Sequence, residues 1–289
     1  MAGVSECIDI LELVSLGKHS GAATIVAGCG VGPLGAKHRN DIIGDILKTA
    51  DTVLLRDESS IELARRELGF EGDAQAILDP AFVWIASRQA ARPAAQPSET
   101  AVLMALRDWP VREYGSALNR QKAEAIKEQF EAELLRFIEA MKPHVGAEAL
   151  VPFCMHKQVV GGDDRLFYRR LLAESPDVRA QLDLRHRTPE DDLRRFETST
   201  HVLAMRFHSV VFALATGRPF LAIDYTLGGK ITGLLTDLGM QDHLISLADF
   251  DGAAAAERLR CGPHQQAALR ERVEASEHCL VQAFREVLA

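Results

Sequence analysis

Residues Thr198–Tyr225, TSTHVLAMRFHSVVFALATGRPFLAIDY, decide the fold class of this chain. The apolar run Val202–Met205 is typical of a buried strand, and the run after it reads as a helix that ends at Gly217. A second apolar strand follows that glycine. Arg206 and His208 therefore stand where a parallel strand passes into a helix, which is where open α/β sheets bind ligands. A fixed cation two residues from a titratable imidazole indicates an anion site beside a proton donor.

Strand-like and helix-like runs alternate along the rest of the chain, which predicts parallel sheets with helices on both faces. We expect strands at 23–27, 52–56, 75–78, 101–106, 149–153, 181–184, 202–205, 220–223 and 244–246. We expect helices at the N-terminus, 40–49, 58–68, 118–141, 263–288 and from Thr188-Pro189-Glu190 onward. Threonine as N-cap, proline at the first helical position and acids in the first turn favour that last helix start.

The composition changes at Ser87–Thr100, SRQAARPAAQPSET, which is rich in alanine and proline and has no aromatic residue. Such a segment is typical of a linker between domains. We therefore predict one domain at 1–90 and a second at 98–263, with the C-terminal helix 264–289 packing back on the first. Two α/β units joined by a linker imply a cleft between them.

The bulk composition excludes several classes of function. The 289 residues are 47% hydrophobic and 26% charged, as in ordinary globular proteins. A net charge of −8 argues against nonspecific binding to nucleic acid or to an acidic membrane. The five cysteines are odd in number and form no C-x-x-C, which favours free thiols in a reducing, cytoplasmic compartment over a zinc site or disulfides. We expect no metal, no membrane span and no secretory signal.

Three arginines follow apolar strands in this sequence: Arg56, Arg107 and Arg206. A guanidinium fork matches the geometry of a carboxylate or a phosphate, so together they favour an anion site. The structural alternative for Arg107 is a surface pair with Asp108. His208 lies at a predicted helix start, where the helix dipole disfavours the imidazolium; that placement suits a general acid once an anion is bound.

Two glycine-containing loops are further candidates for anion contacts. The loop 28–35, with Gly30 and Gly32, follows a strand and precedes a helix. One interpretation is that its backbone amides bind an anion, and the other is that the loop is a tight structural turn. Pro33 interrupts it, and no acid ends the next strand, so it is not a dinucleotide fingerprint. Gly228, Gly229 and Lys230 repeat the arrangement, as a phosphate cradle or as a plain turn. His156 follows another strand, where a turn and a helix cap are the alternative to a site.

Six segments occur in a characteristic order: G-C-G-V-G-P-L at 28–34, L-L-R-D-E-S-S at 54–60, D-P-A-F at 79–82, L-R-D-W at 106–109, M-R-F-H at 205–208, and a G-R-P…Y…K…L-G block over 217–239. Together they resemble the polysaccharide pyruvyl transferase family. Cys29 takes the place of the glutamine that the family usually has.

The resemblance implies two facing Rossmann-like domains of the GT-B type. It also implies an enzyme that transfers a pyruvyl group from phosphoenolpyruvate to a pair of sugar hydroxyls, forming a pyruvate ketal in exopolysaccharide synthesis. Phosphoenolpyruvate would be the donor substrate, with no separate cofactor, and a saccharide or lipid-linked saccharide the acceptor. The family's G-N-x-G-D-E start and G-G-G segment have no counterpart here, so we expect a shortened N-terminal domain.

Carried over residue by residue, the resemblance makes His208 the general acid that protonates the methylene carbon of phosphoenolpyruvate. Arg206 and Arg107 would hold the donor's carboxylate and phosphate, and Arg56 and Lys230 are further candidates. Two alternatives stay open from the sequence. One is a GT-B glycosyltransferase or sugar-nucleotide enzyme on the same architecture, and the other is a non-catalytic family member that binds an anionic sugar or a protein.

Overall fold

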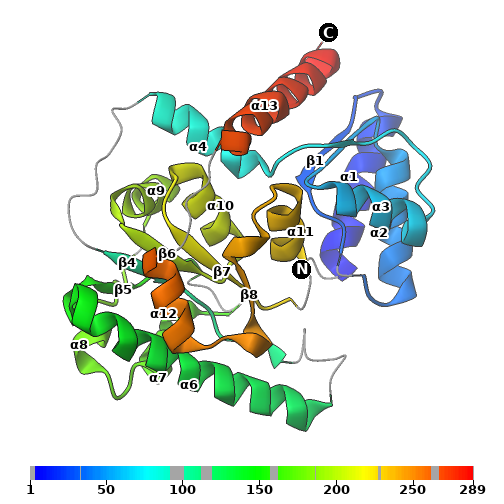
Figure 1. The fold of residues 1–289 in the computed structure, drawn as a ribbon. Helices are drawn as coiled ribbons and strands as arrows, with labels where there is room; N and C mark the ends of the chain where they lie inside the picture. The colour runs from blue at the N-terminus through cyan, green and yellow to red at the C-terminus, as the bar shows by residue number, and fades with distance from the viewer. Residues whose placement is uncertain are drawn as a thin grey trace. The chain divides into compact units, whose positions relative to one another are not determined.

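The computed structural model describes residues 4–32, 34–91, 101–111, 119–156, 162–185, 187–226, 229–261 and 267–288. The chain divides into two compact units, Met1–Ser87 with Ala267–Ala289, and Arg88–Gln266. Each unit holds one sheet whose paired strands are all parallel (Figure 1). The predicted α/β class with parallel sheets is therefore confirmed. The facing GT-B arrangement and the domain boundaries at 1–90 and 98–263 stay predictions.

The first unit has a three-stranded sheet of order β1-β2-β3. Its elements are α1 (Val4–His19), β1 (Ile25–Cys29), α2 (Lys37–Thr49), β2 (Thr52–Leu55), α3 (Glu58–Leu68), β3 (Gln75–Ala76), the helix α4 (Pro80–Ala90) and the C-terminal α13 (Ala267–Leu288). Leu54, Ile77 and Ala283 form one buried cluster of this unit. The amide of Leu78 also donates to Ser276 Oγ at 2.9 Å, so α13 is attached to the sheet by both apolar and polar contacts.

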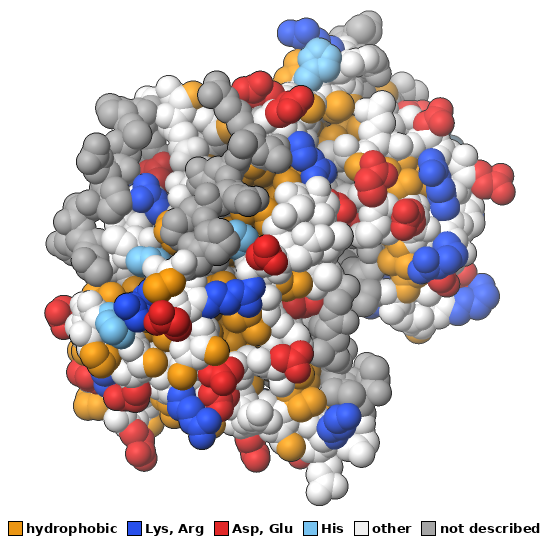
Figure 2. Space-filling view, viewed as in Figure 1, with side chains coloured by type: hydrophobic (Ala, Val, Ile, Leu, Met, Phe, Trp, Pro, Cys, Tyr) orange, Lys and Arg blue, Asp and Glu red, His pale blue; other side chains and the backbone are white. Residues whose placement is uncertain are grey.

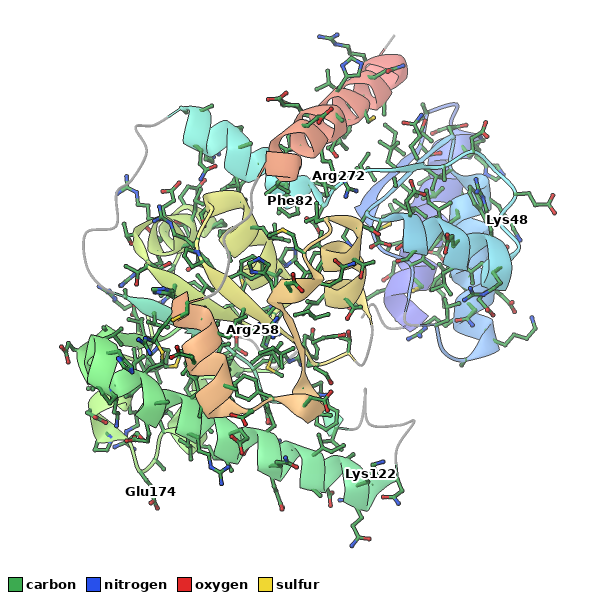
Figure 3. The ribbon with its side chains drawn as sticks, viewed as in Figure 1. Lys48, Phe82, Lys122, Glu174, Arg258 and Arg272 are labelled. Carbon is green, nitrogen blue, oxygen red and sulfur yellow. The ribbon has the colours of Figure 1, made fainter. Side chains whose placement is uncertain are left out.

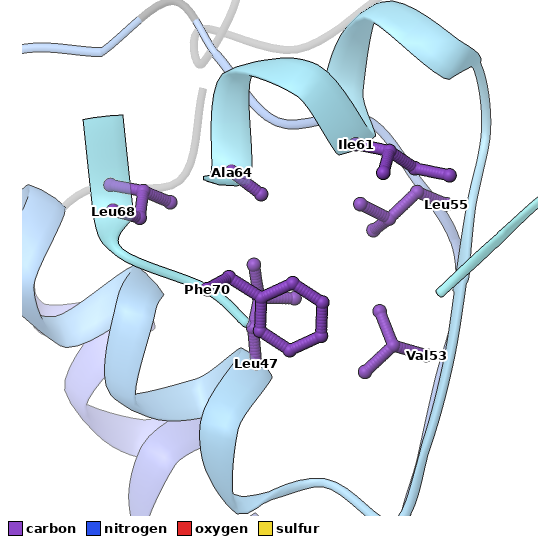
Figure 4. Packing of buried hydrophobic residues seen from close by; sticks show 7 residues of the cluster. All are labelled: Leu47, Val53, Leu55, Ile61, Ala64, Leu68 and Phe70. Atoms are coloured by element: carbon purple, nitrogen blue, oxygen red, sulfur yellow. The ribbon is translucent and has the colours of Figure 1, made fainter. Parts of the chain in front are cut away.

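The main core of the first unit lies between its sheet and its helices. Apolar side chains from α2, β2, α3 and the segment after α3 point toward one another there (Figure 4): Leu47, Val53, Leu55, Ile61, Ala64, Leu68 and Phe70. Asp57 begins α3 as its N-cap, and Gly69 ends it at φ 60°. Burying this apolar stripe is what holds a short helix of 11 residues in place.

The second unit has a five-stranded parallel sheet of order β5-β4-β6-β7-β8. Its elements are β4 (Val102–Ala105), α6 (Arg120–Val145), β5 (Leu150–Pro152), α7 (Asp164–Leu171), α8 (Pro176–Arg179), α9 (Pro189–Thr198), β6 (His201–Ala204), α10 (Phe207–Thr216), β7 (Phe220–Asp224), α11 (Lys230–Asp237), β8 (Leu244–Ser246) and α12 (Gly252–Cys261), with three short 3-10 turns. The strands β4 and β7 are buried along their whole length, as expected for a parallel sheet covered on both faces.

Helices cover both faces of this sheet. The helices α6 and α12 pack together on one face, and α9, α10 and α11 lie on the other (Figure 1). Because α10 is enclosed by the sheet and its neighbouring helices, seven of its ten residues are buried, which explains its apolar sequence. Lys122 on α6 and Glu174 after α7 are exposed and project away from the sheet (Figure 3).

Two sequence predictions about elements are wrong. The expected strand 181–184 is a turn, because the amides of Gln181 and Leu182 bond back to Val178 and Arg179 and the carboxylate of Asp183 binds the Arg185 side chain. The expected linker 87–100 begins too early, because α4 continues to Ala90 on an apolar face that includes buried Phe82 and Ile85. The sequence analysis also missed α4, α8 and α12, whereas the predicted role of Thr188 as the N-cap of α9 is confirmed.

Replacing Gly252 with alanine is expected to destabilise the second unit. A Cβ on Gly252 would lie 2.0 Å from Glu133 O and 2.6 Å from Phe137 N, both main-chain atoms of α6 that cannot rotate away. We expect the free energy of unfolding to fall by about 1–3 kcal/mol. Urea denaturation measures it, with Ala253→Ser on the exposed side of α12 as the control. Unchanged stability in Gly252→Ala would contradict the close approach of α12 and α6.

Candidate functional site

Charged side chains follow four adjacent strands of the second unit at the edge where the strands end. Arg107 comes after β4, His156 after β5, Arg206 and His208 after β6, and Lys230 after β7. The chain passes from β4 to β5 on one side and returns to β6 on the other side of β4, so the strand order switches at this point. The crevice at such a switch point is the usual ligand site of an open α/β sheet.

Arg206 is held by a buried carboxylate from another helix. Its Nε lies 3.1 and 3.0 Å from the two carboxylate oxygens of Asp164, and its Nη2 lies 2.5 Å from Oδ1 of the same residue. Arg206 Nη2 also donates to the carbonyl of Gly162 at 3.1 Å. Both side chains are deeply buried, with Arg206 5% and Asp164 1% exposed. The pair fixes the guanidinium rigidly at the end of β6.

Asp164 accepts more hydrogen bonds than those from Arg206. The amides of Met155 and His156 donate to its Oδ2 at 3.1 and 2.9 Å. Burial raises the pKa of the Asp164 carboxyl, and the Arg206 guanidinium opposes that rise. Since every one of these partners is a donor, the ionised carboxylate is the form that satisfies them all. Asp164 therefore joins the end of β5 to the end of β6.

Arg107 reaches the same place from β4. Its guanidinium lies over the ring of Tyr225, 4.8 Å from the centroid, and Nη1 donates to the Tyr225 hydroxyl at 3.3 Å. Trp109 fixes this tyrosine through a 2.9 Å bond from Nε1 to the Tyr225 carbonyl. A Cβ on Gly162 would lie 3.9 Å from Nη2 of both Arg107 and Arg206, so the two guanidinium groups face the same small space beside this glycine.

His208 and Lys230 flank the ring of Phe207 at the start of α10. His208 is exposed in the first turn of the helix, edge-on to Phe207 with ring centroids 5.6 Å apart. Lys230 opens α11, and its Nζ lies 5.4 Å from the centroid of the same phenylalanine ring. The predicted general acid and the predicted lysine are therefore neighbours in space, although 22 positions separate them in the sequence.

The electrostatics of His156 show that these groups converge. Partial burial lowers the pKa of its imidazole to about 4, and the positive charges of Arg206, Arg107, His208 and Lys230 contribute to the same shift. Four of the residues predicted from the sequence thus act on one side chain. We call Arg107, Arg206, His208 and Lys230 the basic cluster. The carboxylate of Asp164, paired with Arg206, offsets part of the positive charge of the basic cluster.

A family model described as polysaccharide pyruvyl transferase matches residues 6–226, which include Arg107, Arg206 and His208. The match covers more than half of the chain. This protein belongs to the polysaccharide pyruvyl transferase family. A search of curated proteins gave no match.

Arg56, Gly30 and Gly32 of this pyruvyl transferase family member belong to the first unit and form a group of their own. Arg56 donates from Nε to Asp57 at 3.1 Å, and its Nη2 lies 2.1 Å from where a Cβ on Gly30 would be, so a larger residue there would displace the Arg56 side chain. Gly32 has φ 107°, a left-handed conformation that favours glycine. The structure does not place these residues within the basic cluster.

Two amides of the first glycine loop have acceptors inside the protein. Val31 N donates to Ser60 Oγ, and Gly35 N donates to Asn40 Oδ1, each at 3.0 Å. These contacts favour the tight-turn interpretation of this loop over an anion cradle. In the second loop, Gly229 N donates to Thr226 Oγ1 at 3.1 Å, which is again a turn contact. Gly228 lies outside the described residues.

Sequence reasoning missed Asp164 and Tyr225 as parts of the site of this family member. For Asp164 the sequence favours a turn or a helix cap, although Asp163 is the N-cap of α7. The sequence Gly161-Gly162-Asp163-Asp164 does contain a signal. A helix N-cap needs only one carboxylate, so the second aspartate has another role. For Tyr225, the signal was an aromatic residue that directly follows β7, at the edge of the sheet where Arg107, Arg206 and Lys230 also follow strands.

The positive character of the site is local. Acidic and basic side chains are interspersed over the visible face of the protein (Figure 2), in keeping with the net charge of −8. Within the described residues, no helix is long and apolar enough to cross a bilayer. The same part of the chain contains no group of three or more His, Cys, Asp or Glu side chains placed to hold a metal ion.

Proposed function

We propose that this family member transfers a pyruvyl group from phosphoenolpyruvate to two hydroxyls of a saccharide or lipid-linked saccharide in the cytoplasm, forming a pyruvate ketal. The observation that carries the proposal is the basic cluster: Arg206, fixed by a buried carboxylate, faces the same space as Arg107, with His208 and Lys230 beside them. Such a site suits a small, multiply charged anion whose chemistry needs a proton.

Phosphoenolpyruvate carries a carboxylate and a phosphate close together on a three-carbon skeleton. Two guanidinium groups from neighbouring strands place two fixed positive charges beside these two groups, although Nε and Nη2 of Arg206 already donate to Asp164 and Gly162. Asp164 and Tyr225 hold the forks before the donor arrives, so binding does not have to order the arginine side chains. Fixed dipoles and charges of this kind usually make the greatest single contribution to catalysis.

His208 is proposed to protonate the methylene carbon of the bound donor, which becomes a methyl group and leaves C2 electrophilic. One sugar hydroxyl adds to C2, the bond from C2 to the phosphate oxygen breaks, and the second hydroxyl closes the ketal. The two hydroxyl protons balance the reaction: one restores His208 and the other leaves with the phosphate. The position of His208 in the first turn of α10, exposed beside Arg206, supports this role.

The test is incubation of the purified protein with phosphoenolpyruvate and a panel of saccharide acceptors. We expect phosphate release that depends on the acceptor, with a product whose mass and NMR methyl signal identify a pyruvate ketal. UDP- and GDP-sugars serve as the comparison, because thermal stabilisation by these ligands alone would favour a glycosyltransferase. Absence of both turnover and phosphoenolpyruvate binding would contradict the proposal.

Arg107→Lys is expected to weaken donor binding while keeping the charge. Lysine cannot form a two-pronged contact and cannot lie flat on the Tyr225 ring as a guanidinium does. Losing one charge-assisted hydrogen bond raises the KM for phosphoenolpyruvate by roughly 10- to 100-fold. Steady-state kinetics measure this, with Arg120→Lys on the exposed start of α6 as the matched control. An unchanged KM would remove Arg107 from the donor site.

A further inference from the structure

His156 stands beside the basic cluster without a part in the reaction proposed above. It follows β5, and two main-chain hydrogen bonds tie it to Asp164. Asp164 N donates to the His156 carbonyl at 3.0 Å, and His156 N donates to Asp164 Oδ2 at 2.9 Å. Since the same carboxylate holds Arg206, the backbone of His156 and the guanidinium of Arg206 share one rigid support.

Charged groups from the neighbouring strand ends act on the His156 side chain. Arg107 does so from β4, Arg206 and His208 from the start of α10, and Lys230 from α11, while Asp164 contacts its main chain. Partial burial and these positive charges hold the pKa of the imidazole at about 4. The ring is therefore neutral at physiological pH while the site contains no anion.

A bound anion changes this balance. A ligand with two or more negative charges, bound among these cations, offsets the positive potential that lowers the pKa of the His156 imidazole. The protonated ring also has a second N–H donor to offer to a phosphate or carboxylate oxygen. Both effects favour the imidazolium in the complex and the neutral imidazole in the free protein.

We propose that His156 is a further ligand-binding residue of this site, which takes up a proton from solvent when a phosphate-bearing anion binds and donates a hydrogen bond to it. The step adds one proton to a ring nitrogen and breaks no other bond. It makes anion affinity dependent on pH through a residue other than His208. The proposal rests on the proposed function only in naming phosphoenolpyruvate as the natural anion.

The direct test is an NMR titration of the His156 ring, assigned from the signal that disappears in His156→Gln. Inorganic sulfate is the first probe, because it has no proton to exchange near neutral pH, and phosphoenolpyruvate is the second. We expect a pKa of about 4 without ligand and one near or above the ordinary 6.5 with saturating sulfate. A pKa that stays at about 4 when the shifts of His208 show saturation would overturn the proposal.

Affinity provides an independent readout. If the ring regains a pKa of about 6.5 in the complex, linkage predicts that sulfate binds about fourfold more tightly at pH 6 than at pH 8 through His156 alone. This excess should vanish in His156→Gln and persist in His38→Gln, an exposed histidine of α2. Any contribution from His208 is common to all three proteins, so equal pH profiles in wild type and His156→Gln would contradict the proposal.

The two proposals fail in different ways. If sulfate raises the His156 pKa while phosphoenolpyruvate does not bind, this inference stands and the proposed function falls. If phosphoenolpyruvate binds and turns over while the His156 pKa stays low, the function stands and this inference falls. If neither anion binds at the cluster, both are overturned.

Discussion

His208→Asn is expected to lower kcat for pyruvyl transfer by roughly 10²- to 10⁴-fold, the usual contribution of a positioned general acid. Asparagine keeps a polar side chain of similar size at the first turn of α10 and cannot supply the proton. The KM for phosphoenolpyruvate should change little, because Arg107 and Arg206 remain to bind the donor.

Acceptor-dependent phosphate release measures this effect, with His38→Asn as the control for an exposed histidine in the first turn of a helix of the first unit. A kcat within a few fold of wild type would show that another group protonates the donor. A large rise in KM at unchanged kcat would instead make His208 a binding residue.

Asp164→Asn is expected to cost about 3–5 kcal/mol of folding free energy, because it leaves the buried guanidinium of Arg206 without its counterion. The amide is isosteric with the carboxylate, so the loss reports charge and hydrogen bonding rather than a cavity. One side-chain acceptor also becomes a donor that faces the amides of Met155 and His156.

Asp163→Asn is the matched control for this substitution. Asp163 is the adjacent acid, caps α7 and pairs with the partly exposed Arg165, and asparagine caps helices about as well as aspartate. We expect its unfolding free energy to change by less than about 1 kcal/mol. Urea denaturation separates the two cases, and equal stability of the two variants would show that the Asp164–Arg206 pair does not support the site.

The fold was predictable where a local pattern determines an element. Val202–Met205 and Phe220–Ile223 are apolar runs of strand length, and Val202–Ala204 and Phe220–Ile223 lie in buried parallel strands. Thr188 and Gly69 indicate a helix start and a helix end through their own hydrogen-bonding and conformational preferences. The prediction for 181–184 failed because its apolar leucines alternate with residues that bind charged neighbours, and period-two alternation alone does not supply a partner strand.

The site was predictable in part for a topological reason. Side chains that follow parallel strands meet at one edge of the sheet, so the strand ends predict that Arg107, Arg206 and His208 lie together. Lys230 joins them because β7 is the neighbour of β6. Arg56 follows a strand of the first unit, so this strand-end argument does not extend to it, and an arginine at a strand end does not reveal which sheet it belongs to.

Asp164 could not be found by this reasoning. Asp164 lies eight residues beyond His156 in the sequence. Whether it approaches Arg206 depends on how the chain runs from β5 to α7. A strand-and-helix pattern contains no information on that path. The same holds for the 3.3 Å contact of Arg107 with Tyr225, which depends on two segments whose positions are set only by the packed sheet.

Calorimetric titration with phosphoenolpyruvate tests the central claim most directly. We expect saturable binding to the wild-type protein, retained binding to His208→Asn and weaker binding to Arg107→Lys, with Arg120→Lys behaving as wild type. No binding to the wild-type protein, or equal affinity in wild type and Arg107→Lys, would contradict the assignment of the basic cluster as the donor site.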